Sequence, residues 1–163
     1  MSINPEELKA VMRSWTSGVA VVTSYWEGTQ HGMTVNSFTS VSINPALIVV
    51  TLANNTRTCQ LVKQSGKFGV TILSETQKDI SDRFAGKVDE VEDRFYGLET
   101  FQMSYPIPFL SDGLGWLVCS VDKQIDLGFS TLFIAEVIQM KKGYGDPLLY
   151  HNRDYYHLGE KYD

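Results

Sequence analysis

The alternation of apolar and polar positions predicts a chain built mainly from β-strands. Runs rich in β-branched and aromatic residues are separated by turns that contain Gly, Asn and Pro, which is typical of strands joined by tight connections. Such a series, with few helices between, favours an antiparallel sheet closed into a barrel. The strands are expected at 19–26, 31–42, 46–52, 68–73, 116–126 and 131–140, with short closing strands at 147–151 and 154–158.

Helix start and stop signals predict three short helices beside these strands. The first begins at Asn4, which can cap it, and Pro5 follows in the first turn; apolar residues at helical spacing give it one apolar face. The second, at about 57–64, follows a polar loop and ends before Gly66. The third opens with the capping-box sequence Ser-Glu-Thr-Gln at 74–77 and ends near Phe84.

Two strands depart from a simple alternating pattern. The run Ala46 to Leu52 is continuously apolar, which predicts a strand buried on both faces. In the segment 31–42, hydroxyl and amide side chains are mixed irregularly with apolar ones. One interpretation is a strand that passes under a polar, planar ligand; the other is an exposed strand with a high content of Ser and Thr.

Composition limits the class of protein. A chain of 163 residues can bury a substantial core, and its 43% hydrophobic and 20% charged residues are typical of one folded domain, here 1–163. The formal net charge of −5 argues against a nucleic-acid partner, because such a protein normally carries a basic surface. No apolar run approaches the ~20 residues of a membrane span, and the N-terminus lacks the features of a secretory signal. We therefore expect a cytoplasmic protein without a membrane partner.

Common catalytic motifs are absent from the sequence. It contains no Gly-x-Gly-x-x-Gly, Walker or Gly-x-Ser-x-Gly pattern, and its histidines do not form a metal-binding set. Cys59 and Cys119 are expected to be free, buried thiols. The segment 54–58 combines a helix start, hydroxyl groups and Arg57, so it could bind an anion or act only as a helix cap.

Several segments, taken in order, resemble the flavin reductase-like family over nearly the whole chain. The resemblance rests on His-Gly-Met-Thr-Val-Asn-Ser-Phe-Thr-Ser-Val-Ser (31–42), Pro-Ala-Leu (45–47), Asn-Thr-Arg-Thr (55–58), Ser-Gly-Lys-Phe (65–68), Asp-Arg-Phe-Ala-Gly (82–86) and Pro-Leu-Leu-Tyr-His (147–151). It implies an antiparallel, Greek-key-like split β-barrel with a few short flanking helices. It also implies a homodimer that binds FMN, or FAD, near the subunit interface.

The resemblance further implies an NAD(P)H-dependent flavin oxidoreductase. Reduced flavin would pass to a partner monooxygenase or another redox partner. Hydride transfer depends on stacking and distance, so no catalytic residue is assigned. Matching segments imply cofactor contacts at Thr34, Val35, Asn36, Ser37, Ala53, Asn54, Asn55, Thr58, Arg83, Phe84 and Ala85, and substrate contacts at Tyr150 and His151.

One position departs from the family pattern. Many members carry Gly-Asp-His before the strand Thr-Leu-Phe-Ile-Gly-Glu-Val, whereas this chain has Phe129 and Ser130 in place of the Asp and His. Two alternatives to an NAD(P)H-dependent reductase therefore stay open. The first is a flavoredoxin-like electron carrier that holds FMN tightly, with Phe129 covering the flavin. The second is a non-catalytic dimeric barrel.

Overall fold

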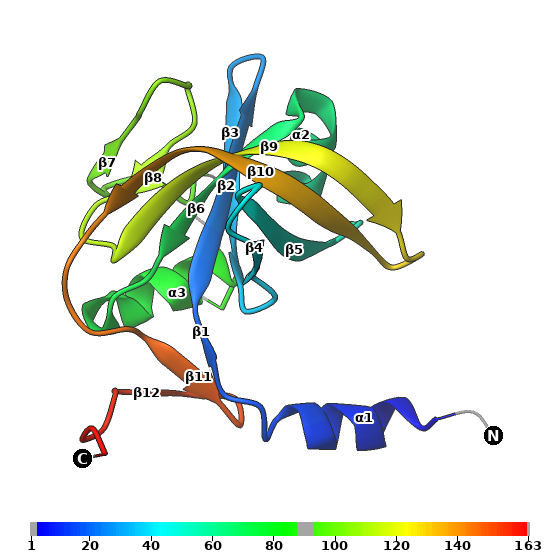
Figure 1. Cartoon of the computed structure of the whole chain (residues 1–163), viewed down its shortest axis with the longest axis vertical. Helices are drawn as coiled ribbons and strands as arrows, with labels where there is room; N and C mark the ends of the chain where they lie inside the picture. The colour runs from blue at the N-terminus through cyan, green and yellow to red at the C-terminus, as the bar shows by residue number, and fades with distance from the viewer. Residues whose placement is uncertain (1–2, 88–92, 163) are drawn as a thin grey trace.

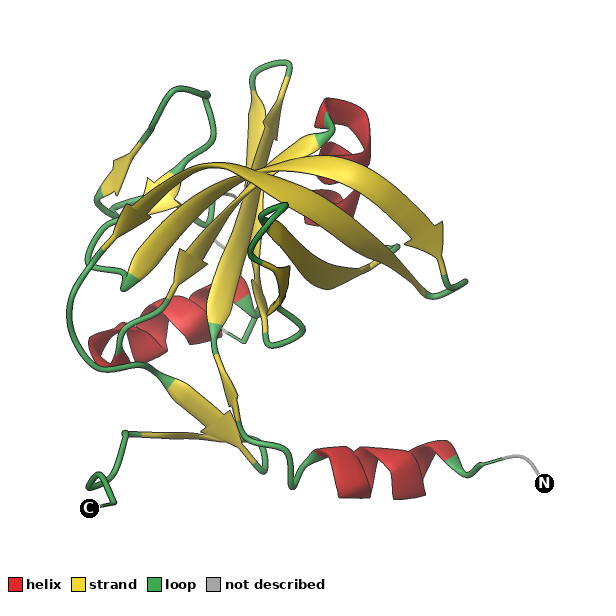
Figure 2. Cartoon of the chain, viewed as in Figure 1, coloured by secondary structure: helices red, strands yellow, loops and turns green. Residues whose placement is uncertain are grey.

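The computed structural model of the chain describes residues 3–87 and 93–162. Its centre is a seven-stranded antiparallel sheet with the strand order β3-β2-β6-β9-β10-β5-β4, curled into a split barrel (Figures 1 and 2). The strands are β2 (Ala20–Trp26), β3 (Thr29–Val35), β4 (Thr39–Ser42), β5 (Leu47–Ala53), β6 (Lys67–Ile72), β9 (Gly115–Asp126) and β10 (Ser130–Lys142). The predicted mainly β, antiparallel barrel is confirmed.

Smaller elements surround this sheet. A three-stranded sheet has the order β1-β11-β12, and two further strands, β7 and β8, pair with each other. A 3-10 helix at Glu75–Gln77 leads directly into α3. The remaining elements are α1 (Pro5–Met12), α2 (Arg57–Ser65), α3 (Lys78–Phe84), β1 (Ser17–Gly18), β7 (Thr100–Phe101), β8 (Phe109–Leu110), β11 (Leu149–His151) and β12 (Asp154–Tyr156).

The barrel interior is filled by side chains, so a ligand must bind at its rim or outside it. Phe68 and Phe133 are fully buried, with ring centroids 6.5 Å apart at the middle of the core. Val50, Val62 and Val70 pack into the same cluster with the Cys119 thiol. Both cysteines are free and buried, as the sequence predicts.

The segment 31–42 is two strands rather than the single strand predicted. β3 ends at Val35 and β4 begins at Thr39. At Ser37 the side chain, and not the backbone, bonds to β5. Its hydroxyl donates to Thr51 O at 2.9 Å and accepts from Thr51 N at 3.1 Å. This side-chain bridge leaves 36–38 as a connection at the barrel rim.

Two other predictions need correction. β5 is buried on one face only, since buried and partly exposed residues alternate along it. The physical reason is that an antiparallel sheet can leave one of its faces open to water. In the third predicted helix, α3 starts only at Lys78, after the 3-10 turn. The acidic sequence at 87–100 also predicts an irregular surface segment, and part of it lies outside the described residues.

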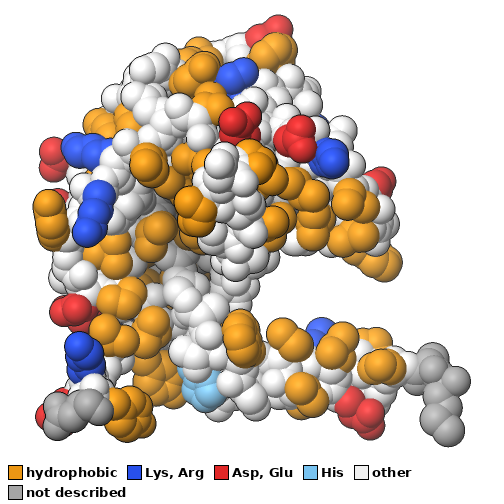
Figure 3. Space-filling view, viewed as in Figure 1, with side chains coloured by type: hydrophobic (Ala, Val, Ile, Leu, Met, Phe, Trp, Pro, Cys, Tyr) orange, Lys and Arg blue, Asp and Glu red, His pale blue; other side chains and the backbone are white. Residues whose placement is uncertain are grey.

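The apolar face of α1 is exposed in the described part of the chain. None of the residues of α1 is buried, and Val11 and Met12 are 68% and 55% exposed. Figures 1 and 3 show this helix lying apart from the barrel, with apolar side chains along it. Asn4 caps the helix as predicted, since its side chain accepts from Glu6 N at 3.0 Å.

Candidate functional site

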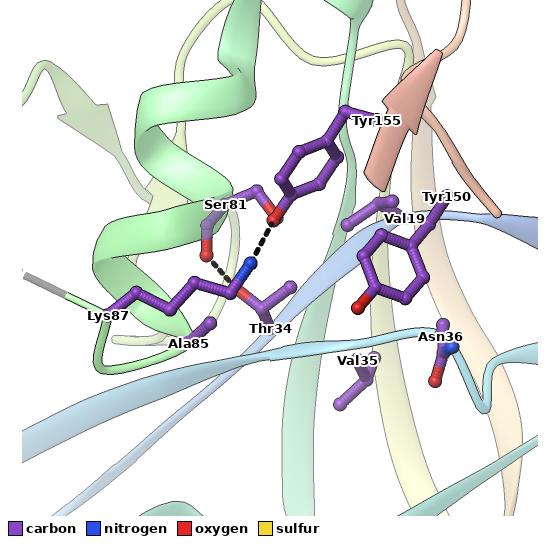
Figure 4. A pocket seen from close by; sticks show the side chains of 9 residues that line it. All are labelled: Val19, Thr34, Val35, Asn36, Ser81, Ala85, Lys87, Tyr150 and Tyr155. Atoms are coloured by element: carbon purple, nitrogen blue, oxygen red, sulfur yellow. Dashed lines mark hydrogen bonds between the residues drawn. The ribbon is translucent and has the colours of Figure 1, made fainter. Parts of the chain in front are cut away.

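A pocket of about 250 Å³ lies at the barrel rim, between the end of β3, the end of α3 and the small sheet of β1, β11 and β12 (Figure 4). Its wall combines hydroxyl groups, an amide, one ammonium group and two tyrosine rings. The lining residues are Val19, Thr34, Val35, Asn36, Ser81, Ala85, Lys87, Tyr150 and Tyr155.

Two contacts attach α3 to β3 and fix one wall of this pocket. The Thr34 hydroxyl donates to the carbonyl oxygen of Ser81 at 2.6 Å. Nearby, Gly32 allows the Phe84 ring to lie against the strand, because a Cβ atom there would be 2.8 Å from that ring. Phe84 is itself 1% exposed and belongs to a core cluster. The wall is therefore held by packing as well as by hydrogen bonds.

The opposite wall comes from the small sheet. β1 pairs with β11, which sets Ser17 opposite Tyr150, and β11 pairs with β12, which sets Tyr150 opposite Tyr155. The two tyrosine rings meet edge to face, with centroids 5.4 Å apart. Thr16 and His151 also share a hydrogen bond of 2.9 Å. Segments from the two ends of the chain thus close one side of the pocket.

A charged network borders the pocket. The Asp82 carboxylate accepts hydrogen bonds from Lys87 at 2.9 Å, from Lys78 at 3.1 Å and from the Tyr155 hydroxyl at 3.0 Å. Burial acts to raise the pKa of Asp82, but these hydrogen bonds outweigh it and leave the pKa below its ordinary value. The hydrogen bond to Asp82 raises the pKa of Lys87. Both groups are therefore charged at neutral pH.

Some of the residues predicted from the sequence to form a site come together here. Thr34, Val35 and Asn36 line the pocket from the end of β3, Ala85 lines it from the end of α3, and Tyr150 lines it from β11. Asn36 is exposed, and among the described residues its amide makes no hydrogen bond. Its donor and acceptor are therefore available to a ligand.

The predicted residues around the start of α2 lie elsewhere, and most of their polar groups are already engaged. The Asn54 amide donates to Gly128 O at 2.8 Å, and its carbonyl oxygen accepts from Thr131 at 2.6 Å and from Lys63 at 3.1 Å. We call these contacts the Asn54 cluster. The fully buried Thr58 hydroxyl bonds His31 at 2.9 Å. Among the other predicted contacts, Ala53 is half-buried and Asn55 is exposed.

The remaining predicted residues also lie outside the pocket lining. Arg83 donates from Nη2 to Tyr96 O at 2.6 Å, so its guanidinium is directed to the loop that follows residue 92. His151 bonds Thr16 and packs against the ring of Tyr156, with centroids 5.8 Å apart. Phe129 is 96% exposed at the turn between β9 and β10, where it does not cover the pocket.

Sequence reasoning missed Val19, Ser81, Lys87 and Tyr155, which also line the pocket. Ser81 lies one helical turn before Ala85, so the face of the third predicted helix could have indicated it. Lys87 directly follows the Gly86 that ends this helix. Nothing in the sequence around Tyr155 indicates a ligand site. This residue reaches the pocket only because β12 pairs with β11 in the folded chain.

The described residues contain no cluster of His, Cys, Asp and Glu side chains that could hold a metal ion. Across the same part of the chain, no helix is long and apolar enough to cross a membrane.

Comparisons with known proteins agree on one family. Residues 12–159 match the model of the flavin reductase like domain. A probable flavin reductase of Rhizobium meliloti (strain 1021) is 38% identical over 135 residues, which is 82% of this chain but only 42% of that protein. The NADH-dependent flavin reductase StyB of Pseudomonas fluorescens is 37% identical over 125 residues, covering 76% of this chain and 70% of StyB.

A solved structure extends the likeness to nearly the whole fold. The styrene monooxygenase flavin reductase SMOB of Pseudomonas putida S12 superposes with a TM-score of 0.84 and 30% identity, over 95% of this chain and 99% of that one. The matched domain spans most of the described residues, and it includes every residue that lines the rim pocket. The chain belongs to the flavin reductase-like domain family.

Proposed function

We propose that this protein is an NAD(P)H-dependent flavin reductase that supplies reduced FMN, or FAD, to a partner monooxygenase. Family membership supports this proposal, as do the names of StyB, an NADH-dependent flavin reductase, and of SMOB, the reductase of a styrene monooxygenase. When bound, a flavin supplies the redox chemistry by accepting a hydride from the reduced nicotinamide. The protein's own part is to bind and orient the two partners.

The observation that carries the proposal is the set of groups in the rim pocket. The exposed Asn36 amide offers a donor and an acceptor side by side, as the alternating carbonyl and nitrogen edge of a flavin ring requires. Thr34, Ser81 and Tyr155 add hydroxyl groups, which suit the hydroxyl-bearing chain of a flavin nucleotide. The donor set therefore fits a flavin.

The size of the pocket indicates that it encloses only part of this cofactor. At about 250 Å³ it is smaller than the roughly 300–1,000 Å³ usual for sites that enclose a small molecule. The remainder of a bound flavin would lie across the open rim. A site of this kind is completed by another surface, and a second copy of the chain is the surface we propose.

The exposed face of α1 supports a homodimer. An isolated helix of this length is marginal in water, because its stability normally comes from packing of its apolar face. Leu8 and Trp15 are 51% and 71% exposed, and a permanent partner would cover them. Val11→Asp should then convert a dimer into a monomer in sedimentation experiments, whereas Lys123→Gln, on an exposed strand, should not.

A visible spectrum with and without NADH tests the proposed function. We expect flavin-dependent oxidation of NADH or NADPH, with FMN affinity lowered in Asn36→Ala. Stoichiometric yellow protein that oxidises neither nucleotide would instead identify a flavoredoxin-like carrier. A protein without affinity for FMN or FAD would refute both and leave a non-catalytic barrel.

A further inference from the structure

We propose that a second copy of the chain inserts the tip of its β9–β10 hairpin, residues 127–129, between α1 and the barrel, where its Phe129 covers the rim pocket. This inference rests on the proposed function, because it names the surfaces through which the proposed homodimer forms and completes the flavin site. It concerns a residue particular to this chain, since many members of the family have Asp where Phe129 stands.

The chain exposes more surface than a compact protein of its mass. Its solvent-accessible surface is 10276 Å², whereas a compact monomer of 18.3 kDa normally exposes about 8,100 Å². The excess is about 2,000 Å² for each chain. Burial of that area by both copies, about 4,000 Å² in total, falls within the roughly 2,000–5,000 Å² that permanent homodimers bury. The excess surface therefore matches a second copy of this chain.

The hairpin tip presents apolar side chains on a fixed backbone. Asn54 N donates to Phe129 O at 2.9 Å, and the Asn54 amide donates to Gly128 O at 2.8 Å. The carboxylate of Asp126 accepts from the same amide at 3.2 Å, so this charge is directed back toward its own chain. Leu127 and Phe129 are nonetheless 57% and 96% exposed. Because a fixed loop loses little conformational freedom on binding, this tip is suited to packing against another surface.

The apolar face of α1 offers a matching surface. Val11 and Met12 at the end of α1, and Trp15 just after it, are all exposed. Figures 1 and 3 show the β9–β10 hairpin projecting from the barrel above α1, with a hollow between them, so the two apolar surfaces of one chain stay separate. A two-fold axis through this hollow would place each hairpin tip against α1 of the other copy. One symmetry operation then covers both surfaces on both chains.

The connection from α1 to β1 places this contact beside the rim pocket. Just after α1, the carbonyl oxygen of Arg13 accepts from Asn152 N at 3.0 Å, at the turn that follows β11. Four residues later β1 pairs with β11, which sets Ser17 opposite Tyr150 in the pocket wall. A ring that packs against Trp15 therefore lies next to this wall.

An aromatic ring suits the part of a flavin that the pocket does not enclose. In the proposed function, the flavin extends from the pocket across the open rim. A phenylalanine ring can stack on a planar cofactor and exclude water from it. Phe129 is not among the residues that line the pocket of its own chain. A second copy can supply this cover through the same contact that buries its hairpin tip.

Cross-linking between two different chains tests the contact. When a Met12→Cys chain and a Phe129→Cys chain are co-expressed, a short bis-maleimide should join them into a covalent dimer. The native Cys59 and Cys119 are buried and should not react in the folded protein. Co-expression of Met12→Cys with Tyr144→Cys is the control, because Tyr144 is also exposed but lies beyond the end of β10. We expect no covalent dimer from the control pair.

Flavin binding tests the cover. Phe129→Ala should raise the Kd for FMN about threefold to tenfold, the usual effect of losing one aromatic contact. It should also make the fluorescence of bound FMN easier to quench with iodide. Tyr144→Ala, which removes another exposed ring, should change neither quantity.

Three outcomes overturn the inference. The first is wild-type protein that sediments as a monomer. The second is a dimer in which Met12→Cys joins Tyr144→Cys but not Phe129→Cys. The third is unchanged FMN affinity and iodide quenching in Phe129→Ala, which would show that the tip does not cover the site. Failure of the proposed function is distinguishable, because protein that cross-links as expected but binds neither FMN nor FAD would refute that function and leave the interface standing.

Discussion

Asn54→Ala is expected to lower the stability of the protein substantially, although the family resemblance assigns this residue to the cofactor. The Asn54 side chain joins the ends of β5, β10 and α2. Its amide oxygen accepts from Thr131 at 2.6 Å and from Lys63 at 3.1 Å, and its amide nitrogen donates to Gly128 O at 2.8 Å. It also donates to Asp126 at 3.2 Å. The substitution removes all of these contacts together.

The magnitude follows from how deeply each partner is buried. Thr131 is 1% exposed, so leaving its hydroxyl without an acceptor costs about 1–3 kcal/mol. The bonds to Lys63, Asp126 and Gly128 are exposed to water and together add about 1 kcal/mol. The free energy of unfolding should therefore fall by about 2–4 kcal/mol.

Urea unfolding followed by tryptophan fluorescence measures this change directly. With an m-value near 2 kcal/mol/M, the midpoint should move down by about 1–2 M. Asn55→Ala is the matched control, because the neighbouring Asn55 is exposed, and its effect should stay within about 0.5 kcal/mol. A loss below that limit in Asn54→Ala would refute the structural role, particularly if FMN affinity fell sharply in the folded protein.

Three further predictions concern packing, protonation and thiol reactivity. Gly32→Ala places a Cβ atom 2.8 Å from the Phe84 ring, and calorimetry should show a loss of about 1–3 kcal/mol. Burial, with two nearby guanidinium groups, lowers the pKa of His31 from 6.5 to about 4. Between pH 4 and 6.5 the unfolded chain therefore binds more protons at His31 than the folded chain does. The free energy of unfolding should fall as the pH decreases from 6.5 to 4, and it should fall less in His31→Gln. Burial raises the pKa of Cys59 and, to about 12, of Cys119, so a thiol reagent should label them only after unfolding.

Local patterns were sufficient to predict most of the fold. The capping signals at Asn4 and Gly66 have the predicted geometry, because each acts within a few residues of its own position. The break between β3 and β4 could not be predicted in this way. It depends on the Ser37 hydroxyl meeting Thr51, a residue fourteen positions away that only the folded barrel brings near.

The same reasoning explains α1. Spacing at Leu8, Val11, Met12 and Trp15 correctly indicates one apolar face. Periodicity reports that such a face exists, but it contains no information about which surface covers it. A helix that packs on its own barrel and a helix that does not therefore have the same sequence pattern, and only the folded structure shows that this face is exposed among the described residues.

The candidate site was predictable only in part, for a related physical reason. Asn36 and Asn54 carry the same amide and both lie in segments that resemble the family. A polar group can bind a ligand strongly only if its hydrogen bonds are not already made within the chain, since breaking them offsets the gain. Asn54 is engaged by several partners, whereas the Asn36 amide makes no hydrogen bond to the described residues. Residue type alone cannot distinguish these cases, so Asn36 becomes the stronger candidate for ligand binding only through the hydrogen bonds that the fold leaves unmade.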